Sequence, residues 1–519
     1  MREHFPGEQP DRRPSDRLAL TERDALVIAY GDHIREPGVA PLQTLGTFLH
    51  AHTADAISGV HVLPFFPSSS DDGFAIVDYR SVDPSLGTWG DISTLSQRFD
   101  LMFDAVFNHV SSESDWFSRF LRDEPDYRDW FIQVEGNPDL SQVLRPRNLP
   151  LLNTFETASG PKRVWTTFSR DEIDNNVKNP DVLLALLDVL LLYVERGAKF
   201  IRLDAIGYLW KEIGTSCIHL PQTHRVIQLM RSILDAVAPN VMLITETNVP
   251  HRDNVSYFGD GTDEAQLIYN FALPPLVLHS FVTGNADALT RWAGTLALPT
   301  ARVTFLNFLA SHDGIGLTPA RNVLTEPEIG ELVRLAERRG GFVSYKANQD
   351  GTSSPYELNL NLYDALFDPS SDGSEQVQIA RFITAHAIML ALPGLPAIYL
   401  HSLLGSKGDR AAVERTGVPR RINREKLVRA EVERELDDPS SRRSQVLKRL
   451  TALLVERQLS PAFQPTGPSA VLRLDRRVFA LRRMSSDGKR EAICLHNVSG
   501  DDVNVNGQSL GPYETKWLA

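Results

Sequence analysis

The sequence predicts an α/β protein, a (β/α)8 TIM barrel with loop insertions after strands three and seven and a C-terminal antiparallel β domain. Its 519 residues are roughly three times the length of a usual domain, which suits a large barrel with additions. Eight short apolar runs end in polar residues and are mostly separated by helix-length segments, a rhythm typical of parallel strands with crossover helices. No Gly-x-Gly-x-x-Gly motif follows the first run, so an open dinucleotide-binding sheet is not indicated.

The barrel elements follow one another along the whole first part of the chain. The predicted strands are residues 25–31, 59–66, 101–109, 199–206, 241–247, 267–273, 303–313 and 395–402. Amphipathic stretches such as 180–197 and 223–239 supply the crossover helices.

Two intervals between strands are too long for simple loops, and the pattern changes near the end of the chain. After about residue 450, short alternating runs separated by turn residues indicate an antiparallel sheet. The predicted parts are 1–109, first part of the barrel; 110–168, inserted domain B; 169–313, barrel continued; 314–368, inserted region B′; 369–450, end of the barrel; and 451–519, the C-terminal β domain.

Composition excludes several classes of protein. With 42% hydrophobic and 23% charged residues the chain is globular rather than disordered. The formal net charge of −12 repels phosphate backbones and anionic lipid, so nucleic acid and membrane surfaces are not expected partners.

The remaining general signals favour a cytoplasmic protein. Cys217 and Cys494 are too few for a disulfide framework and are expected to be reduced thiols. Residues 1–17 are charged and contain prolines without an apolar core, which predicts no secretory signal. No run approaches the roughly 18 apolar residues that span a membrane. The sequons at Asn254 and Asn497 are then chance matches.

Charged and polar side chains gather where the predicted strands end, which is where a barrel of this type builds its active site. Alternation along a strand puts Arg202 and Asp204 on one side of the chain, so the guanidinium can keep the carboxylate ionised, which suits a nucleophile. Taken singly, each such group could equally be a cap or a structural ion pair. The strand-end residues are Asn108, His109, Arg202, Asp204, Glu246, His312 and Asp313.

This grouping favours glycosidic-bond chemistry. One ionised carboxylate and one carboxylic acid of raised pKa are the equipment for that reaction. The competing interpretation is a hydrolytic metal site, but the His-Glu-x-x-His spacing that such a site would use is absent.

Five segments, in order and spacing, resemble the α-amylase superfamily of retaining glycoside hydrolases and transglycosylases. They are residues 73–91, 104–109, 200–205, 244–247 and 308–313. Four more segments resemble the sucrose phosphorylase group of that superfamily, at 61–74, 202–217, 271–279 and 311–316. The resemblance covers essentially the whole chain.

The resemblance implies residue roles. Asp204 would be the nucleophile, Glu246 the general acid/base and Asp313 the stabiliser of the transition state, with the carboxyls of Asp204 and Glu246 about 5 to 5.5 Å apart. Phe74 and Tyr79 would form aromatic walls of the glucosyl subsite, although both could instead be core residues. The residues expected to hold the glucosyl unit are Asp71, His109, Arg202, His312 and Arg424.

In this group a glucosyl residue passes first to the nucleophile and then to inorganic phosphate, giving α-glucose 1-phosphate. Arg147 matches the loop arginine that binds phosphate, with Tyr356 on the second insertion. The alternative for Arg147 is a solvated loop charge.

The chain departs from sucrose phosphorylases on the acceptor side. It has Asn248 where those enzymes carry histidine, and Ser-Pro-Tyr-Glu at 354–357 where they carry Asp-Leu-Tyr-Gln. Residues 245–259, 307–317 and 343–359 look most like the glucosylglycerate phosphorylases of the group, whose acceptor is anionic. Candidate groups for that acceptor are Lys346, Arg147, Lys407, Arg421 and the Asn248 amide, whereas Glu357 would repel it if it pointed inward.

The resulting expectation is a phosphorylase acting on 2-O-α-D-glucosyl-D-glycerate, with small carbohydrates and phosphate as partners. Rival acceptors are those of sucrose, sucrose 6-phosphate and glucosylglycerol phosphorylases. Rival classes are an α-glucosidase, a non-catalytic member of the fold and an unrelated barrel enzyme. The resemblance implies no metal or organic cofactor, phosphate being a co-substrate, and a possible homodimer.

Overall fold

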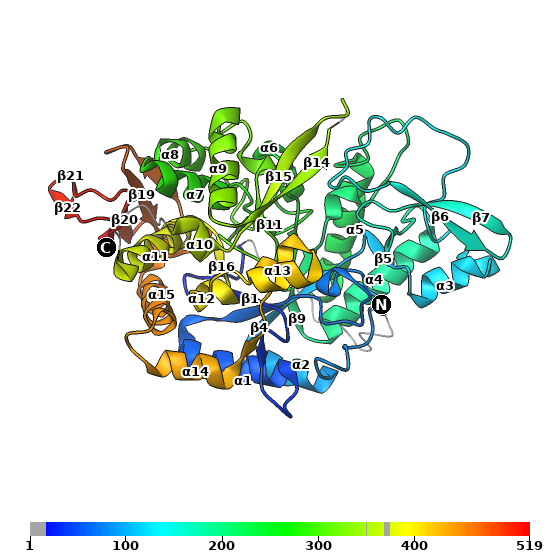
Figure 1. Cartoon of the computed structure of the whole chain (residues 1–519), viewed down its shortest axis with the longest axis horizontal. Coiled ribbons are helices and arrows are strands. Elements are labelled where there is room, and N and C mark those ends of the chain that lie inside the picture. Colours follow the sequence, from blue (N-terminus) through cyan, green and yellow to red (C-terminus); the bar gives the residue numbers. More distant parts are fainter. Residues whose placement is uncertain (1–16, 349, 368–373, 519) are drawn as a thin grey trace.

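The computed structural model describes residues 17–348, 350–367 and 374–518. The prediction about a secretory signal rests on residues 1–17, and all but the last of these lie outside the described residues. The helices and strands below carry the labels of Figure 1.

Eight parallel strands close into a barrel at the centre of the molecule (Figure 1). Neighbours around the barrel are neighbours along the chain, and β1 pairs with both β3 and β16 to close it. The strands are buried along almost their whole length, as expected for a sheet covered on both faces. They are β1 (Leu26–Ala29), β3 (Gly59–Val62), β4 (Asp100–Ala105), β9 (Ala198–Leu203), β10 (Met242–Thr245), β11 (Leu267–Tyr269), β12 (Thr304–Asn307) and β16 (Leu395–Tyr399). Six of them lie within the predicted runs, and β4 and β9 begin one residue before theirs, so the predicted barrel is confirmed.

Helices surround the barrel and begin at recognisable signals. The helix α4 (Pro180–Glu195) starts with proline at its first position, and the Asn179 side chain caps it by accepting the N–H of Asp181. The other helices around the barrel are α1 (Pro41–Thr53), α2 (Trp89–Ser96), α5 (Pro221–Val237), α6 (His251–Asn254), α7 (Leu273–Thr283), α8 (Asp287–Ala293), α11 (Glu375–Ala391), α12 (Leu400–Leu403), α13 (Arg410–Thr416), α14 (Arg429–Asp437) and α15 (Arg442–Gln458). Short strands β2 (Ile34–Arg35) and β17 (Leu427–Val428) pair beside them.

Domain B lies between β4 and β9, at the right of Figure 1. It contains β5 (His109–Ser111), α3 (Asp115–Leu121), β6 (Leu152–Thr157), β7 (Gly160–Trp165) and β8 (Glu172–Asp174). Because β8 pairs with β5, the inserted structure continues past residue 168.

A buried lysine joins domain B to the barrel. Lys211, 4% exposed, forms an ion pair with Asp174 of β8 and donates to Asn108 Oδ1 at 2.6 Å. Asp174 also accepts the N–H and the hydroxyl of Thr167, each at 2.7 Å. This network fixes the end of β8 against the chain that leaves β4.

Region B′ follows β12. Its three-stranded sheet has the order β13 (Ile315–Gly316), β15 (Ser353–Asn359), β14 (Phe342–Ala347), and α9 (Glu326–Arg338) packs beside it, followed by α10 (Leu362–Leu366). The pairing of β14 with β15 shifts register between Ser344 and Tyr345. Such a shift changes which side chains share a face of the sheet.

The C-terminal domain is an antiparallel sheet at the left of Figure 1, as predicted. Its strands are β18 (Ser469–Leu472), β19 (Val478–Met484), β20 (Glu491–Asn497) and β23 (Thr515–Leu518), with a hairpin of β21 (Val503–Val505) and β22 (Gln508–Leu510). The sheet begins after α15, so residue 450, the predicted boundary, falls inside that helix. Both cysteines, Cys217 and Cys494, are buried and unpaired.

No helix in the described part of the chain is both long enough and apolar enough to cross a membrane.

Candidate active site

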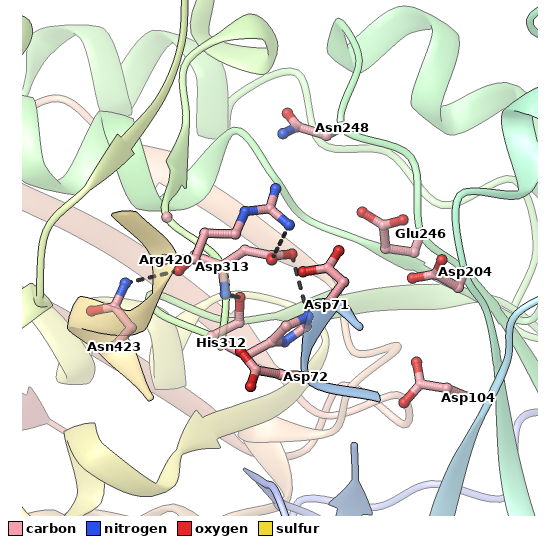
Figure 2. Close-up of polar contacts among 12 residues, drawn as sticks. Asp71, Asp72, Asp104, Asp204, Glu246, Asn248, His312, Asp313, Arg420 and Asn423 are labelled. Carbon is pink, nitrogen blue, oxygen red and sulfur yellow. Dashed lines mark hydrogen bonds and ion pairs between the residues drawn. The ribbon is translucent and has the colours of Figure 1, made fainter. Parts of the chain in front are cut away.

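A cavity opens at the carboxyl ends of the barrel strands, between the barrel, domain B and region B′. Eleven residues singled out from the sequence line it: Asp71, Phe74, His109, Arg147, Asp204, Glu246, Asn248, His312, Asp313, Tyr356 and Glu357. Figure 2 shows Asp204 and Glu246 side by side, with Asp71, Asp313 and Arg420 facing them.

Asp204 and Glu246 lie on two sides of one guanidinium group. Arg202 Nη1 lies 2.8 Å from Asp204 Oδ1, and Arg202 Nη2 lies 3.9 Å from Glu246 Oε2. Glu246 Oε2 also accepts the N–H of Ala205 at 2.9 Å. Ala205 has φ of +46°, a left-handed conformation that costs a residue with a Cβ some energy and turns the chain sharply after Asp204.

The two carboxyls differ in how firmly Arg202 holds them. Burial raises the pKa of Glu246 to about 7, and nearby Asp204 and Asp313 add to the rise against the opposing Arg202. Burial also raises the pKa of Asp204, but Arg202 opposes this at hydrogen-bond distance. A closely spaced pair of carboxyls favours one shared proton, and the geometry puts that proton on Glu246.

Asp104 holds the Arg202 side chain in place. The two form a buried ion pair, and Asp104 Oδ2 lies 2.6 Å from His61 Nε2. Burial acts to raise the pKa of Asp104, but His61 and Arg202 outweigh it and lower the pKa to about 2. Asp104 therefore stays charged and keeps the guanidinium in place.

Asp313 is surrounded by cations. Arg420 Nη1 lies 2.8 Å and Arg424 Nη2 lies 3.4 Å from its Oδ1. Burial acts to raise the pKa of Asp313, but Arg420, His312 and Arg424 hold it well below its usual range. Burial lowers the pKa of His312 to about 3, so this imidazole is neutral and stacks on Phe74 at 4.8 Å between ring centroids.

Asp71 is bound by two arginines. Arg147 Nη2 lies 3.1 Å from its Oδ2, and Arg424 Nη1 lies 3.6 Å from its Oδ1. Burial acts to raise the pKa of Asp71, but these arginines and Arg420 hold it well below its usual range. Arg147 lies 5.6 Å over the Phe168 ring and 3.9 Å from Glu172.

Asn248, Tyr356 and Glu357 bring an amide, a phenol and a carboxylate group to the cavity wall. Asn248 Nδ2 donates to the Tyr356 hydroxyl at 3.3 Å. Glu357, 2% exposed, accepts the N–H of Gly314 and pairs with Arg420. The carboxylate that could have repelled an anion is therefore paired with a cation.

Several buried polar atoms at the cavity make no hydrogen bond within the described structure. They include Nε2 of His109, Oδ1 of Asn248, Nδ1 of His312 and Oε2 of Glu172. Buried polar atoms are normally satisfied, so these atoms are suited to bind a polar ligand such as a sugar.

Other predicted residues lie outside the cavity wall. Tyr79 is 4% exposed and donates its hydroxyl to the carbonyls of Val106 and His109, at 2.7 and 2.9 Å. Lys346 is half-buried on β14 and does not line the cavity. Arg421 pairs with Asp72. Lys407 lines a separate hollow with Arg338 and Arg410.

Sequence reasoning missed several residues that line the cavity. Arg420 lies on a short 3₁₀ helix, Pro419–Asn423, after the last barrel strand. Phe168 and Glu172 come from domain B, and Tyr208 follows β9. Arg420 comes four residues before Arg424 in the sequence, and both guanidinium groups contact Asp313 Oδ1 in the structure.

Across the described ranges, no group of three or more histidine, cysteine, aspartate or glutamate side chains is arranged to hold a metal ion.

Comparison with protein families places residues 55–313 in a match to the alpha amylase catalytic domain. A glucosylglycerate phosphorylase of Allomeiothermus silvanus is 51% identical over 511 residues, which are 96% of this chain and 91% of that protein. A glucosylglycerate phosphorylase of Escherichia coli K12 is 47% identical over 490 residues, 94% of this chain and 87% of that protein.

More distant relatives share the architecture. A sucrose phosphorylase of Bifidobacterium adolescentis is 29% identical, over 85% of this chain and 86% of that protein. The crystal structure of a sucrose 6F-phosphate phosphorylase from Thermoanaerobacter thermosaccharolyticum superposes with a TM-score of 0.81 at 27% identity, covering 96% of both chains.

Proposed function

Since the chain belongs to the α-amylase family, we propose that it is a retaining glycoside phosphorylase that converts 2-O-α-D-glucosyl-D-glycerate and phosphate into α-D-glucose 1-phosphate and D-glycerate. The observation that supports this most is one cavity holding an acid/base pair and a loop arginine, in a chain about half identical to glucosylglycerate phosphorylases.

In the first step Asp204 attacks the anomeric carbon as the glycosidic bond breaks. Glu246, with its pKa raised to about 7, gives its proton to the departing glycerate oxygen. Asp204 becomes covalently attached to the glucosyl unit. Asp313, held ionised by Arg420 and Arg424, stabilises the positive charge that develops on the sugar ring.

In the second step a phosphate oxygen attacks the same carbon and Asp204 leaves. Glu246, now ionised, accepts the proton that the attacking group gives up. Two inversions restore the α configuration. Arg147 lies at the cavity within reach of Asp71, so a phosphate bound to it is beside the glucosyl unit.

The glucosyl subsite is the part of the cavity formed by barrel-strand ends. Asp71, His109 and His312 offer acceptors and donors to sugar hydroxyls, and Phe74 offers an aromatic face. Arg202 and Arg424 act behind them by fixing Asp204, Asp313 and Asp71. Tyr79 lies outside the cavity wall and supports the subsite through its hydroxyl, which binds the carbonyls of Val106 and His109.

The reaction as proposed uses no metal or organic cofactor, because Asp204 carries the intermediate and Glu246 the proton. Activity unchanged after exhaustive chelation supports this, and restoration by a divalent cation contradicts it.

We also propose a cytoplasmic homodimer. Its two cysteines are free thiols, as is usual for proteins of a reducing compartment. Light scattering is expected to give twice the 57.9 kDa chain mass.

The test offers α-glucose 1-phosphate with D-glycerate, fructose, fructose 6-phosphate, glycerol or no acceptor, and measures phosphate release. Release that depends on D-glycerate is the expected result. Release with fructose, fructose 6-phosphate or glycerol instead assigns the chain a rival acceptor. Release without any acceptor indicates an α-glucosidase, and no release with any of them contradicts the proposal.

A further inference from the structure

The chemistry of the proposed acceptor fixes where its carboxylate must lie. In 2-O-glucosylglycerate the carboxyl carbon is bonded directly to the carbon that bears the glycosidic oxygen. A cation that binds this carboxylate must therefore lie beside the catalytic carboxyls, and a cation at the outer mouth cannot reach it.

Two candidate cations meet this requirement among the residues whose placement the structure describes. Arg147 and Arg420 line the cavity, whereas Lys346, Lys407 and Arg421 do not. Arg147 makes one hydrogen bond, to Asp71, which the glucosyl unit needs. Arg420 lies beside Asp313, in the part of the cavity that Tyr356 also lines.

Arg420 is held rigidly by Glu357. Its Nε lies 3.2 Å from Glu357 Oε1 and its Nη2 lies 2.8 Å from Glu357 Oε2, a two-pronged contact. The Glu357 carboxylate is itself buried and fixed by the N–H of Gly314. Arginine bound in this way presents its remaining N–H groups in a defined plane.

Arg420 still has donors for a ligand. The contacts to Glu357 and the one from Nη1 to Asp313 use three of the five guanidinium N–H groups, which leaves one on each terminal nitrogen. Asp313 is shared between Arg420 and Arg424. The side chain is 23% exposed, toward the cavity.

We propose that Arg420 binds the carboxylate of the glycerate acceptor and that Glu357 is the positioning residue that orients it. The inference rests on the proposed function and deepens it. Glycerol carries a CH2OH group where glycerate carries the carboxylate, so selectivity for glycerate over glycerol reports on this contact.

The experiment compares acceptors from one common intermediate. The enzyme is given α-D-glucosyl fluoride, a donor without phosphate, together with D-glycerate and glycerol in equal concentration, and the ratio of the two glucosylated products is measured. Because both acceptors attack the same glucosyl-enzyme, a general loss of catalysis cancels from the ratio.

In Arg420→Gln the glycerate-to-glycerol product ratio is expected to fall about 10- to 100-fold, the effect of a charged hydrogen bond. Arg420→Lys keeps the positive charge but loses the two-pronged guanidinium, and it is expected to give an intermediate ratio. This variant replaces Arg420→Gln in the test if Arg420→Gln fails to fold. The matched control is Arg421→Gln, an arginine on the same 3₁₀ helix that points to Asp72 and should leave the ratio unchanged.

An unchanged ratio in both Arg420 variants overturns the inference, as does an equal fall in Arg421→Gln. If the unaltered enzyme itself shows no preference for glycerate, the proposed function fails rather than the role of Arg420. Glu357→Gln is expected to raise KM for glycerate with little change in the KM for glycerol, since only the orientation of Arg420 is altered.

Discussion

Arg147 and Asp71 form a hydrogen-bonded ion pair across the cavity, with Nη2 3.1 Å from Oδ2. Arg147 belongs to domain B and is proposed to bind phosphate. Asp71 belongs to the barrel and is proposed to bind the glucosyl unit. A sugar hydroxyl that takes over Asp71 therefore frees Arg147 for phosphate. With these proposed roles, the pair is expected to couple the filling of the donor subsite to the binding of phosphate.

Removing Arg147 is expected to change the fate of the intermediate. In Arg147→Ala, supplied with α-D-glucosyl fluoride and phosphate, the ratio of glucose 1-phosphate to free glucose should fall about 10- to 100-fold. Phosphate loses its charged donor, whereas attack by water does not need one. The control is Arg145→Ala on the same loop, whose guanidinium donates to the Leu149 carbonyl. An unaltered ratio in Arg147→Ala would remove the phosphate role.

Glu246 is expected to set the alkaline limb of the pH profile. With its pKa raised to about 7 by burial, the acid form needed for glycoside cleavage is lost above neutral pH. The profile of kcat/KM for glucosylglycerate should decline above about pH 7. A decline that begins only above pH 9 would contradict this assignment.

The same raised pKa affects stability. The unfolded chain releases this proton near the ordinary pKa of 4.5 and the folded chain near 7, so the folded state loses relative stability as pH rises between them. Glu246→Gln should therefore raise the free energy of unfolding at pH 8 by about 1–3 kcal/mol. Below pH 4 the two proteins should unfold alike, and urea titrations at both pH values measure the difference.

Azide distinguishes the two catalytic carboxyls. With α-D-glucosyl fluoride, Asp204→Gly should lose at least about 10³-fold of its activity and form β-glucosyl azide through one inversion. Glu246→Ala should still form the glucosyl-enzyme and give α-glucosyl azide through two inversions. NMR of the anomeric proton identifies each product, and exchanged stereochemistry would reverse the assigned roles.

Lys211 should be the strongest link between domain B and the barrel. Lys211→Met leaves Asp174 charged and buried without its cation, at a cost of about 3–5 kcal/mol in the free energy of unfolding. The double variant Lys211→Met/Asp174→Asn removes both charges and should lose less. Thermal unfolding of the three proteins measures the difference, and equal loss in single and double variants would contradict it.

Much of this architecture could be predicted because its signals are local in the sequence: apolar runs mark the strands, and charged residues mark where the strands end. Arg202 lies near the end of β9, and Asp204 and Glu246 directly follow β9 and β10, so their convergence follows from the barrel itself. Lys346 was harder to place, because the irregular pairing between Ser344 and Tyr345 alters which face of β14 it occupies. Arg420 does not directly follow a strand, and the direction of its side chain depends on Glu357, which lies 63 residues earlier.

The most direct test supplies 2-O-α-D-glucosyl-D-glycerate with and without inorganic phosphate and follows the products by proton and phosphorus NMR. The account predicts D-glycerate and α-D-glucose 1-phosphate in equal amounts, formed only when phosphate is present. Formation of the β anomer, or of free glucose at the same rate without phosphate, would contradict it.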